Sequence, residues 1–145
     1  MYVMDCTRPD IAFALCKLSR YTGSVSVEDW KAIGRVFRYL KRAKDMSLHY
    51  NVFPLVLEGY SDASWITSSG ENMSTFGWIF TLVGGAISWA LKKQMCKPHS
   101  TMESEFIALA AASEEAEWLR NLLLDINLWS QPMPAISLHC ENGYV

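Results

Sequence analysis

The longest stretch without a charged side chain, from Asn72 to Leu91, constrains the fold more than any other feature. It is long enough to cross a membrane as a helix. Gly84 and Gly85 lie near its middle, however, between two runs rich in aromatic and β-branched residues, a pattern typical of a β-hairpin. We therefore predict a buried hairpin with strands at 76–83 and 86–89, and no contact with a membrane.

The composition is that of a globular protein of 145 residues, half of them apolar. This length excludes a multidomain enzyme. The four cysteines are far apart and form no C-x-x-C pair, which argues against a zinc site and against a disulfide framework. No apolar signal-peptide segment follows Met1, so we expect an intracellular protein that is not secreted.

Charge divides the chain into two parts. Residues 1–50 contain nine Lys or Arg and five Asp or Glu, whereas residues 51–145 contain four and ten. Such a shift indicates a boundary, which we place where Asn51 and Pro54 interrupt the sequence. We predict a helical segment at 1–52 and an α/β domain at 53–145.

The basic segment contains two predicted helices. The first begins at Pro9 and ends by Gly23, and the second begins after Ser26, which has capping-box spacing to Asp29. The second helix has apolar residues at helical spacing, namely Trp30, Ile33, Phe37 and Leu40. Four cations recur at the same spacing on another face, namely Lys31, Arg35, Arg38 and Arg42. Such a row is either a phosphate-binding surface or an ordinary solvated helix face.

The acidic part predicts a strand, the hairpin, a long helix and a final strand. The first strand covers 56–61, the helix extends from 100 to about 127, and the last strand covers 135–140. Three strands followed by a helix and a strand predict a mixed α/β sheet with a crossover helix packed on it.

Three carboxylates stand where these elements begin or end. Asp62 follows the first strand, Glu141 follows the last, and Glu105 lies near the start of the helix. Steps of three and four from Glu105 reach only apolar residues, which predicts that Glu105 faces the sheet. The same steps from Glu103 soon become polar, which predicts a carboxylate that stabilises the helix N-terminus. If Asp62, Glu105 and Glu141 lie close together in the fold, their carboxylate oxygens are suitable ligands for Mg²⁺. If they do not, they are ordinary acidic residues at strand ends and at a helix start.

Five motifs resemble, in order and spacing, the ribonuclease H region of copia-type long-terminal-repeat retrotransposon Pol polyproteins. They are YSDASW at 60–65, GGAISW at 84–89, STMESEFIAL at 100–109, EEAEWLRNLL at 114–123 and SLHCEN at 137–142. Two further motifs resemble the connection between reverse transcriptase and ribonuclease H in the same polyproteins. These are TRPDIAFALCKLSRYTG at 7–23 and DWKAIGRVFRYLK at 29–41. The resemblance covers nearly the whole chain.

The resemblance implies a ribonuclease H-like fold and cleavage of the RNA strand of an RNA–DNA hybrid. Members of the family hold two Mg²⁺ or Mn²⁺ ions with four carboxylates, and no small-molecule cofactor is implied. The family's first three carboxylates fall on Asp62, Glu105 and Glu141. Lys92 and Lys93, together with the cation row at 31–42, would contact the backbone of the hybrid.

Two departures from the family pattern make catalysis doubtful. Glu141 stands where the family has an aspartate, and its extra methylene moves the carboxylate by roughly 1.5 Å, an error that can cost about 100-fold in rate. The fourth carboxylate, with a last strand and helix, would follow Val145, so we expect a C-terminally truncated fold whose strand at 135–140 is an open edge. No Tyr-x-Asp-Asp motif occurs, which excludes polymerase activity.

The sequence is therefore compatible with three functions, and it does not decide whether the chain is an enzyme. The first is a polyprotein fragment with an incomplete, inactive ribonuclease H-like domain that binds nucleic acid weakly. The second is a ribonuclease H with residual activity. The third is a non-catalytic protein-interaction module that uses Trp118, Trp129 and the open sheet edge.

Overall fold

The computed structural model describes residues 7–50, 55–65, 74–126, 132–140 and the backbone of 143–144. The chain divides into two compact units, 1–49 and 50–145, and each is described by itself. The boundary predicted between residues 52 and 53 falls outside the described residues. Within the described ranges, no helix combines the length and apolar character needed to cross a membrane.

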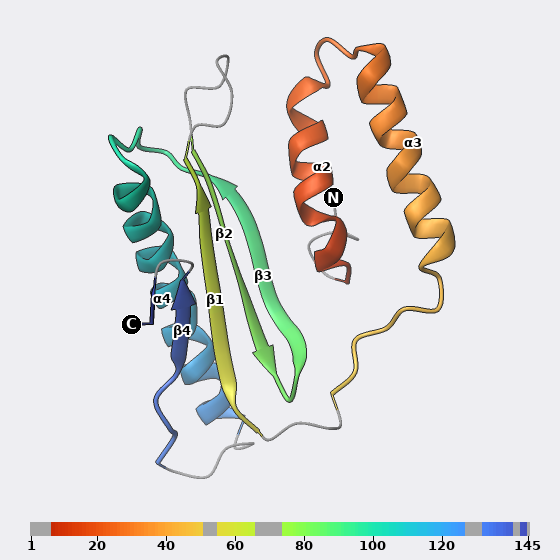
Figure 1. The fold of residues 1–145 in the computed structure, drawn as a ribbon. Helices are drawn as coiled ribbons and strands as arrows, with labels where there is room; N and C mark the ends of the chain where they lie inside the picture. Colours follow the sequence, from red (N-terminus) through yellow and green to blue (C-terminus); the bar gives the residue numbers. More distant parts are fainter. Residues whose placement is uncertain (1–6, 51–54, 66–73, 127–131, 141–142, 145) are drawn as a thin grey trace. The chain divides into compact units, whose positions relative to one another are not determined.

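The first unit is built from two helices (Figure 1). Its elements are η1 (Pro9–Ile11), α2 (Ala12–Leu18), η2 (Ser19–Tyr21) and α3 (Val27–Arg42). Both predicted helices are therefore confirmed. α3 begins with the predicted capping box, in which the Ser26 hydroxyl accepts from the Asp29 N–H and the Asp29 carboxylate accepts from the Ser26 N–H.

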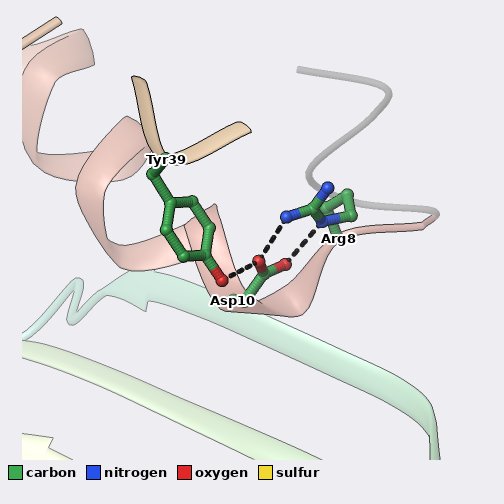
Figure 2. A network of polar contacts seen from close by, with 3 residues as sticks. All are labelled: Arg8, Asp10 and Tyr39. Carbon is green, nitrogen blue, oxygen red and sulfur yellow. Dashed lines mark hydrogen bonds and ion pairs between the residues drawn. The ribbon is translucent and has the colours of Figure 1, made fainter. Parts of the chain in front are cut away.

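A polar network joins the start of this unit to α3 (Figure 2). The Arg8 guanidinium donates to both carboxylate oxygens of Asp10, at 2.9 and 2.6 Å, and the Tyr39 hydroxyl donates to the same carboxylate at 2.6 Å. The hydrogen bond from Arg8, assisted by that from Tyr39, lowers the pKa of Asp10 to about 2. The network therefore links residues 29 positions apart in the sequence.

The apolar row predicted on α3 is only partly buried. Ile33 and Leu40 are half-buried, and Leu40 packs against a small core around Ile11. Trp30 and Phe37, in contrast, are 65% and 68% exposed. Periodicity predicts a row at helical spacing but cannot tell which of its members the rest of the protein covers.

The second unit is a mixed sheet with a helix on one face (Figure 1). Its elements are β1 (Leu57–Ser64), β2 (Thr75–Leu82), β3 (Gly85–Lys93), α4 (Thr101–Asp125), β4 (Ser137–Cys140) and β5 (Gly143–Tyr144). The strand order is β3-β2-β1-β4-β5, in which only β1 and β4 are parallel. The predicted mixed α/β sheet with its crossover helix is confirmed.

The uncharged stretch forms the predicted hairpin of β2 and β3. Leu82 pairs with Gly85, which leaves Val83 and Gly84 as a two-residue turn. Both turn residues have positive φ, 54° and 77°, as a type I′ turn requires. The right-handed twist of the two strands thus dictates a left-handed backbone at a valine, a residue that rarely adopts it.

The core of this unit combines large side chains of β2 with small ones of α4. Phe76, Trp78 and Phe80 pack against the alanines at 108, 112 and 116. The ring of Phe80 also lies over Gly59 of β1, where an added Cβ would come within 2.5 Å of Phe80 Cε1. Small residues on both neighbours therefore make room for the aromatic layer.

We predicted that the strand at 135–140 is an open edge of the sheet, and this prediction is wrong for its last two residues. β5 pairs antiparallel with β4 through His139 with Tyr144 and through Cys140 with Gly143. The chain therefore turns back and covers this part of β4 with its own backbone.

Candidate metal and nucleic-acid site

Asp62 lies within β1, which continues to Ser64 instead of ending at 61 as predicted. Buried and exposed residues alternate along this strand, and Ser61 and Ala63 belong to the buried set. Because side chains of a strand alternate between its two faces, Asp62 lies on the face opposite to α4. Its carboxylate is exposed there, two residues beyond Tyr60.

Glu105 is half-buried beside the inner stripe of α4 and is not its first member. The buried residues of the helix are Ser104, Ala108, Ala112, Ala116, Leu119 and Leu123. The row of sheet-facing residues predicted from Glu105 has the same later members as this buried row, but it starts one residue too late, at Glu105 instead of Ser104. The prediction that Glu105 faces the sheet is therefore correct only in part, because Ser104 occupies the central position.

Ser104 is held by a buried glutamine that follows β3. The Gln94 amide donates to the Ser104 carbonyl at 2.7 Å, and the Ser104 hydroxyl donates to the Gln94 carbonyl at 3.2 Å. The Gln94 N–H donates to the carbonyl of Ser74, directly before β2. These contacts fix the first turns of α4, and with them Glu105, at the end of the sheet where β2 starts and β3 ends.

The same end of the sheet contains the end of β1. Ser64 pairs with Thr75, and the indole N–H of Trp65 donates to the carbonyl of Pro98, shortly before α4, at 3.3 Å. The strand that contains Asp62 and the helix turn that contains Glu105 are therefore both anchored at one end of the sheet, but Asp62 extends from the face opposite to α4, so these contacts alone do not bring the two carboxylates together.

Glu141 lies outside the described residues, so the meeting of the three acids stays a prediction. The described part of β4 leads toward Asp62, because Cys140 pairs in parallel with Ser61. One residue earlier, the rings of Tyr60 and His139 stack with centroids 4.9 Å apart. Partial burial and the neighbouring Glu58 raise the pKa of Tyr60. No three acids, histidines or cysteines among the described residues form a metal-binding group.

Glu103 has the role at the helix N-terminus that the sequence predicts. Ser100 caps α4 by accepting from the Glu103 N–H at 3.1 Å. The Glu103 carboxylate accepts from the backbone N–H of His99 at 2.5 Å. Glu103 therefore stabilises the start of the helix, while Glu105 lies nearer the sheet.

The four predicted cations of α3 are all exposed on one side of the helix. Lys31 lies 3.9 Å from Glu28, and the Nε of Arg38 donates to the Gly34 carbonyl of its own helix. Among the described residues, no carboxylate pairs with Arg35 or Arg42. The row is thus available to an anion, and contact with nucleic acid stays a prediction.

Lys92 and Lys93 are both exposed but extend from opposite faces of β3. The ammonium of Lys92 lies 4.9 Å from the centroid of the Trp78 ring, on the side of α4. Lys93 pairs with Thr75 on the other face, the face that also presents Asp62. Of these two, only Lys93 shares a face with Asp62, and contact of either lysine with nucleic acid stays a prediction.

Sequence reasoning missed Gln94 and Ser104 as positioning residues. A signal for Ser104 was present, because it begins a row of small residues spaced by four that continues through Ala108, Ala112 and Ala116. Gln94 gave no comparable signal, since a polar residue after two lysines is usually a solvated strand end.

Most of the chain is similar in sequence to known proteins that have related names. The retrovirus-related Pol polyprotein from transposon TNT 1-94 of Nicotiana tabacum is 38% identical over 128 residues, 88% of this chain and 10% of the relative. The Pol polyprotein from transposon RE2 of Arabidopsis thaliana is 34% identical over 94% of this chain and 9% of the relative. No family model and no solved structure matches.

A third relative has a length similar to this chain. Secreted RxLR effector protein 161 of Plasmopara viticola is 40% identical over 120 residues, which cover 82% of this chain and 84% of that protein. Because one relative is named as secreted, the expected intracellular location stays a prediction. The chain spans about a tenth of the length of the transposon polyproteins it matches. It belongs to the family of retrovirus-related Pol polyproteins from transposons, as the resemblance to copia-type elements predicted.

Proposed function

We propose that residues 50–145 form a ribonuclease H-like domain that binds a divalent cation and an RNA–DNA hybrid but does not cleave the hybrid at a measurable rate. The observation that carries this proposal is the parallel pairing of Ser61 with Cys140. These are the residues directly before Asp62 and Glu141 in the sequence, so the pairing supports a common position for the two acids.

Asp62, Glu105 and Glu141 would hold the cation. Carboxylate oxygens are the ligands that Mg²⁺ and Mn²⁺ prefer, and the exposure of Asp62 leaves its oxygens accessible to a hydrated ion and a phosphate. Bound there, the metal would supply a hydroxide nucleophile and stabilise charge on the phosphate. The contribution of the chain is to hold Glu105 by the Gln94 and Ser104 contacts and to keep Asp62 rigid within a paired strand.

The proposed lack of cleavage rests on Glu141. A carboxylate displaced by one methylene holds a metal at a changed distance from the phosphate, and an error of about 1 Å costs on the order of 100-fold. A cation and a hybrid can still bind, because affinity depends less steeply on the position of one ligand than the rate does. The cations at 31–42 and Lys93 would add sequence-independent attraction for the backbone.

Residual ribonuclease H activity is the alternative that the same strand pairing favours. The interaction module has weaker support, since Trp118 is exposed but β5 covers part of the edge, and Trp129 lies outside the described residues. Cleavage of a hybrid therefore decides between the two remaining functions.

The metal site is tested by titrating Mn²⁺ into the isotope-labelled chain and following amide resonances. We expect the resonances of Asp62 and Glu105 to broaden together, and Asp62→Asn to abolish the broadening at both. Broadening of neither residue, or of only one, contradicts the ribonuclease H-like site.

Cleavage is tested with a labelled RNA–DNA hybrid in Mn²⁺ at high protein concentration. We expect no product beyond that of Asp62→Asn, and we expect Glu141→Asp to raise the rate above that background. Cleavage by the unmodified chain that Asp62→Asn removes would establish the alternative, an active ribonuclease H.

A further inference from the structure

We propose that α3 binds single-stranded nucleic acid, with phosphates on its cations and unpaired bases stacked on Trp30 and Phe37. The inference rests on the proposed function, because it deepens the nucleic-acid binding assigned above to the cation row. It assigns a binding role to two residues that the sequence analysis treated only as part of an apolar row, and it specifies the strand form that this surface prefers.

Two large rings on α3 are mostly exposed in the part of the chain that the structure describes. Trp30 and Phe37 keep 65% and 68% of their surface exposed, and they are seven residues apart, so they lie on nearly the same side of the helix. Seven residues correspond to about 10.5 Å along the axis. That length is of the order of a few nucleotides of one strand.

The cation row lies beside these rings on the exposed half of the helix. Relative to Trp30 and Phe37, the cations at 31 and 38 are each displaced by one residue, or about 100° around the axis. Arg35 and Arg42 continue the row, and in the described part of the chain neither pairs with a carboxylate. A strand along α3 would therefore meet positive charge on one side and aromatic surface on the other.

Gly34 keeps the space between the two rows open. It follows Trp30 by four positions and precedes Phe37 by three, and no neighbouring atom lies within 4 Å of the place where a Cβ would stand. No side chain at this position separates the rings from the cations. A sugar–phosphate backbone has room to pass there while its bases turn toward the rings.

This combination favours a single strand over a duplex or a protein. In a duplex both faces of each base are covered by neighbours, so exposed rings find stacking partners only on unpaired bases. The centre of a protein interface is enriched in aromatic residues and arginine but depleted of charged residues as a whole, so a row of four like charges beside two rings fits it less well. Here cations adjoin both aromatic residues, which is the composition of single-strand binding grooves.

The test measures binding of the full-length chain to a fluorescent pyrimidine-rich DNA of about a dozen nucleotides by anisotropy. We expect Trp30→Ala and Phe37→Ala each to weaken binding at least about five-fold, and Trp30→Phe to retain most of the affinity. Trp118→Ala, which removes a ring that is 58% exposed on α4, is the matched control and should leave affinity unchanged. Arg35→Ala should reduce the salt dependence by about 0.7 in the slope of log K against log salt.

Three outcomes overturn the proposal. Loss of affinity in Arg35→Ala but not in the two ring variants shows a purely electrostatic surface. Equal affinity for single strands and duplexes shows that the rings do not select unpaired bases. A change of oligomeric state in Trp30→Ala, seen by sedimentation without any effect on DNA binding, shows a protein interface.

The failure of this proposal is distinguishable from the failure of the proposed ribonuclease H-like site. Mn²⁺ binding at Asp62 and oligonucleotide binding at α3 are therefore measured separately, on the unmodified chain and on Trp30→Ala, because Asp62 lies in the other unit. A chain that binds no Mn²⁺ at Asp62 but loses oligonucleotide affinity in Trp30→Ala refutes the metal site alone. The opposite pair of results refutes the α3 surface alone.

Discussion

Gln94 and Ser104 form two reciprocal hydrogen bonds between the residue after β3 and the first turns of α4. Both residues are almost completely buried, at 1% and 0% exposure. Each supplies the partner that the other needs away from water, and the pair sets the rotation of the helix on the sheet. The half-buried position of the neighbouring Glu105 follows from this contact.

Gln94→Ala should destabilise the second unit by about 2–4 kcal/mol. The substitution leaves the Ser104 hydroxyl buried without its partner, which costs about 1–3 kcal/mol, and it creates a cavity, which costs about 1 kcal/mol more. Urea unfolding measures the change. Ser74→Ala is the matched control, since the buried Ser74 hydroxyl has no hydrogen-bond partner among the described residues, and it should be neutral or stabilising. Equal losses in both variants would refute the role of the pair.

The start of α4 was predictable from sequence, but its rotation was not. The cap at Ser100 and the carboxylate at Glu103 are local features, because they depend on spacing within one turn. Which side faces the sheet depends on Gln94, ten residues earlier and on another element. A polar pair satisfied in the core cannot be recognised by an apolar pattern, so the predicted stripe began one residue late.

Gly59→Ala should destabilise the sheet by about 1–3 kcal/mol through overpacking. The new methyl group would lie 2.5 Å from Phe80 Cε1 and would also collide with the Leu138 side chain. Urea unfolding of the full chain measures the loss. The control is Gly34→Ala, where nothing lies within 4 Å, and alanine in a helix should instead stabilise by about 0.5–1 kcal/mol. A gain of stability at Gly59 would contradict the close packing of this layer.

Val83→Asn should stabilise the hairpin by about 1 kcal/mol. Val83 has a φ of 54° in the turn, a conformation that asparagine adopts more readily than a β-branched residue. Followed by Gly84, the asparagine completes the Asn-Gly pair preferred in type I′ turns. Val83→Ala tests the cause, because it removes the branched side chain without supplying this preference. A thermal midpoint raised equally by both variants would exclude turn conformation as the reason.

Asp10→Asn should reduce the amount of stability that the first unit loses as the pH falls below 4. The folded pKa of Asp10, about 2, lies below the ordinary value of 3.8. Its carboxylate therefore stabilises the fold above pH 4, and this contribution disappears as the pH falls from 4 through 2. The effect should be about 1 kcal/mol or less, because the Arg8–Asp10 pair is partly exposed.

Urea unfolding followed by circular dichroism at pH 7, 4, 3 and 2 checks the pH prediction. The unmodified chain should lose more stability below pH 4 than Asp10→Asn does. Asp45→Asn controls for the general loss of a negative charge, since Asp45 is exposed. Parallel pH profiles of the unmodified chain and Asp10→Asn would contradict the assignment.

The candidate site was predictable in its residue types but not in its assembly. Asp62 could be placed on a strand from its neighbours, but the face it occupies became clear only from the alternating burial along β1. Glu141 depends on how β4 pairs with β1, a contact across more than 70 residues of sequence that no local pattern specifies. Trp30 and Phe37 satisfied an apolar period, yet the structure leaves both mostly exposed while Ile33 and Leu40 of the same row are half-buried.

Substitutions of Glu103 and Glu105, two glutamates near the start of α4, should separate effects on stability from effects on metal binding. Glu103 accepts from the His99 N–H and lies at the positive end of the helix dipole, so Glu103→Gln should lower stability by about 0.5–1 kcal/mol and leave Mn²⁺ binding intact. Glu105→Gln should weaken Mn²⁺ binding at Asp62 at least ten-fold, because the amide loses the negative charge that holds a cation. Urea unfolding and Mn²⁺ titration on the same two proteins measure both effects. If Glu103→Gln reduces metal affinity as much as Glu105→Gln does, the assignment of Glu105 as the metal ligand is wrong.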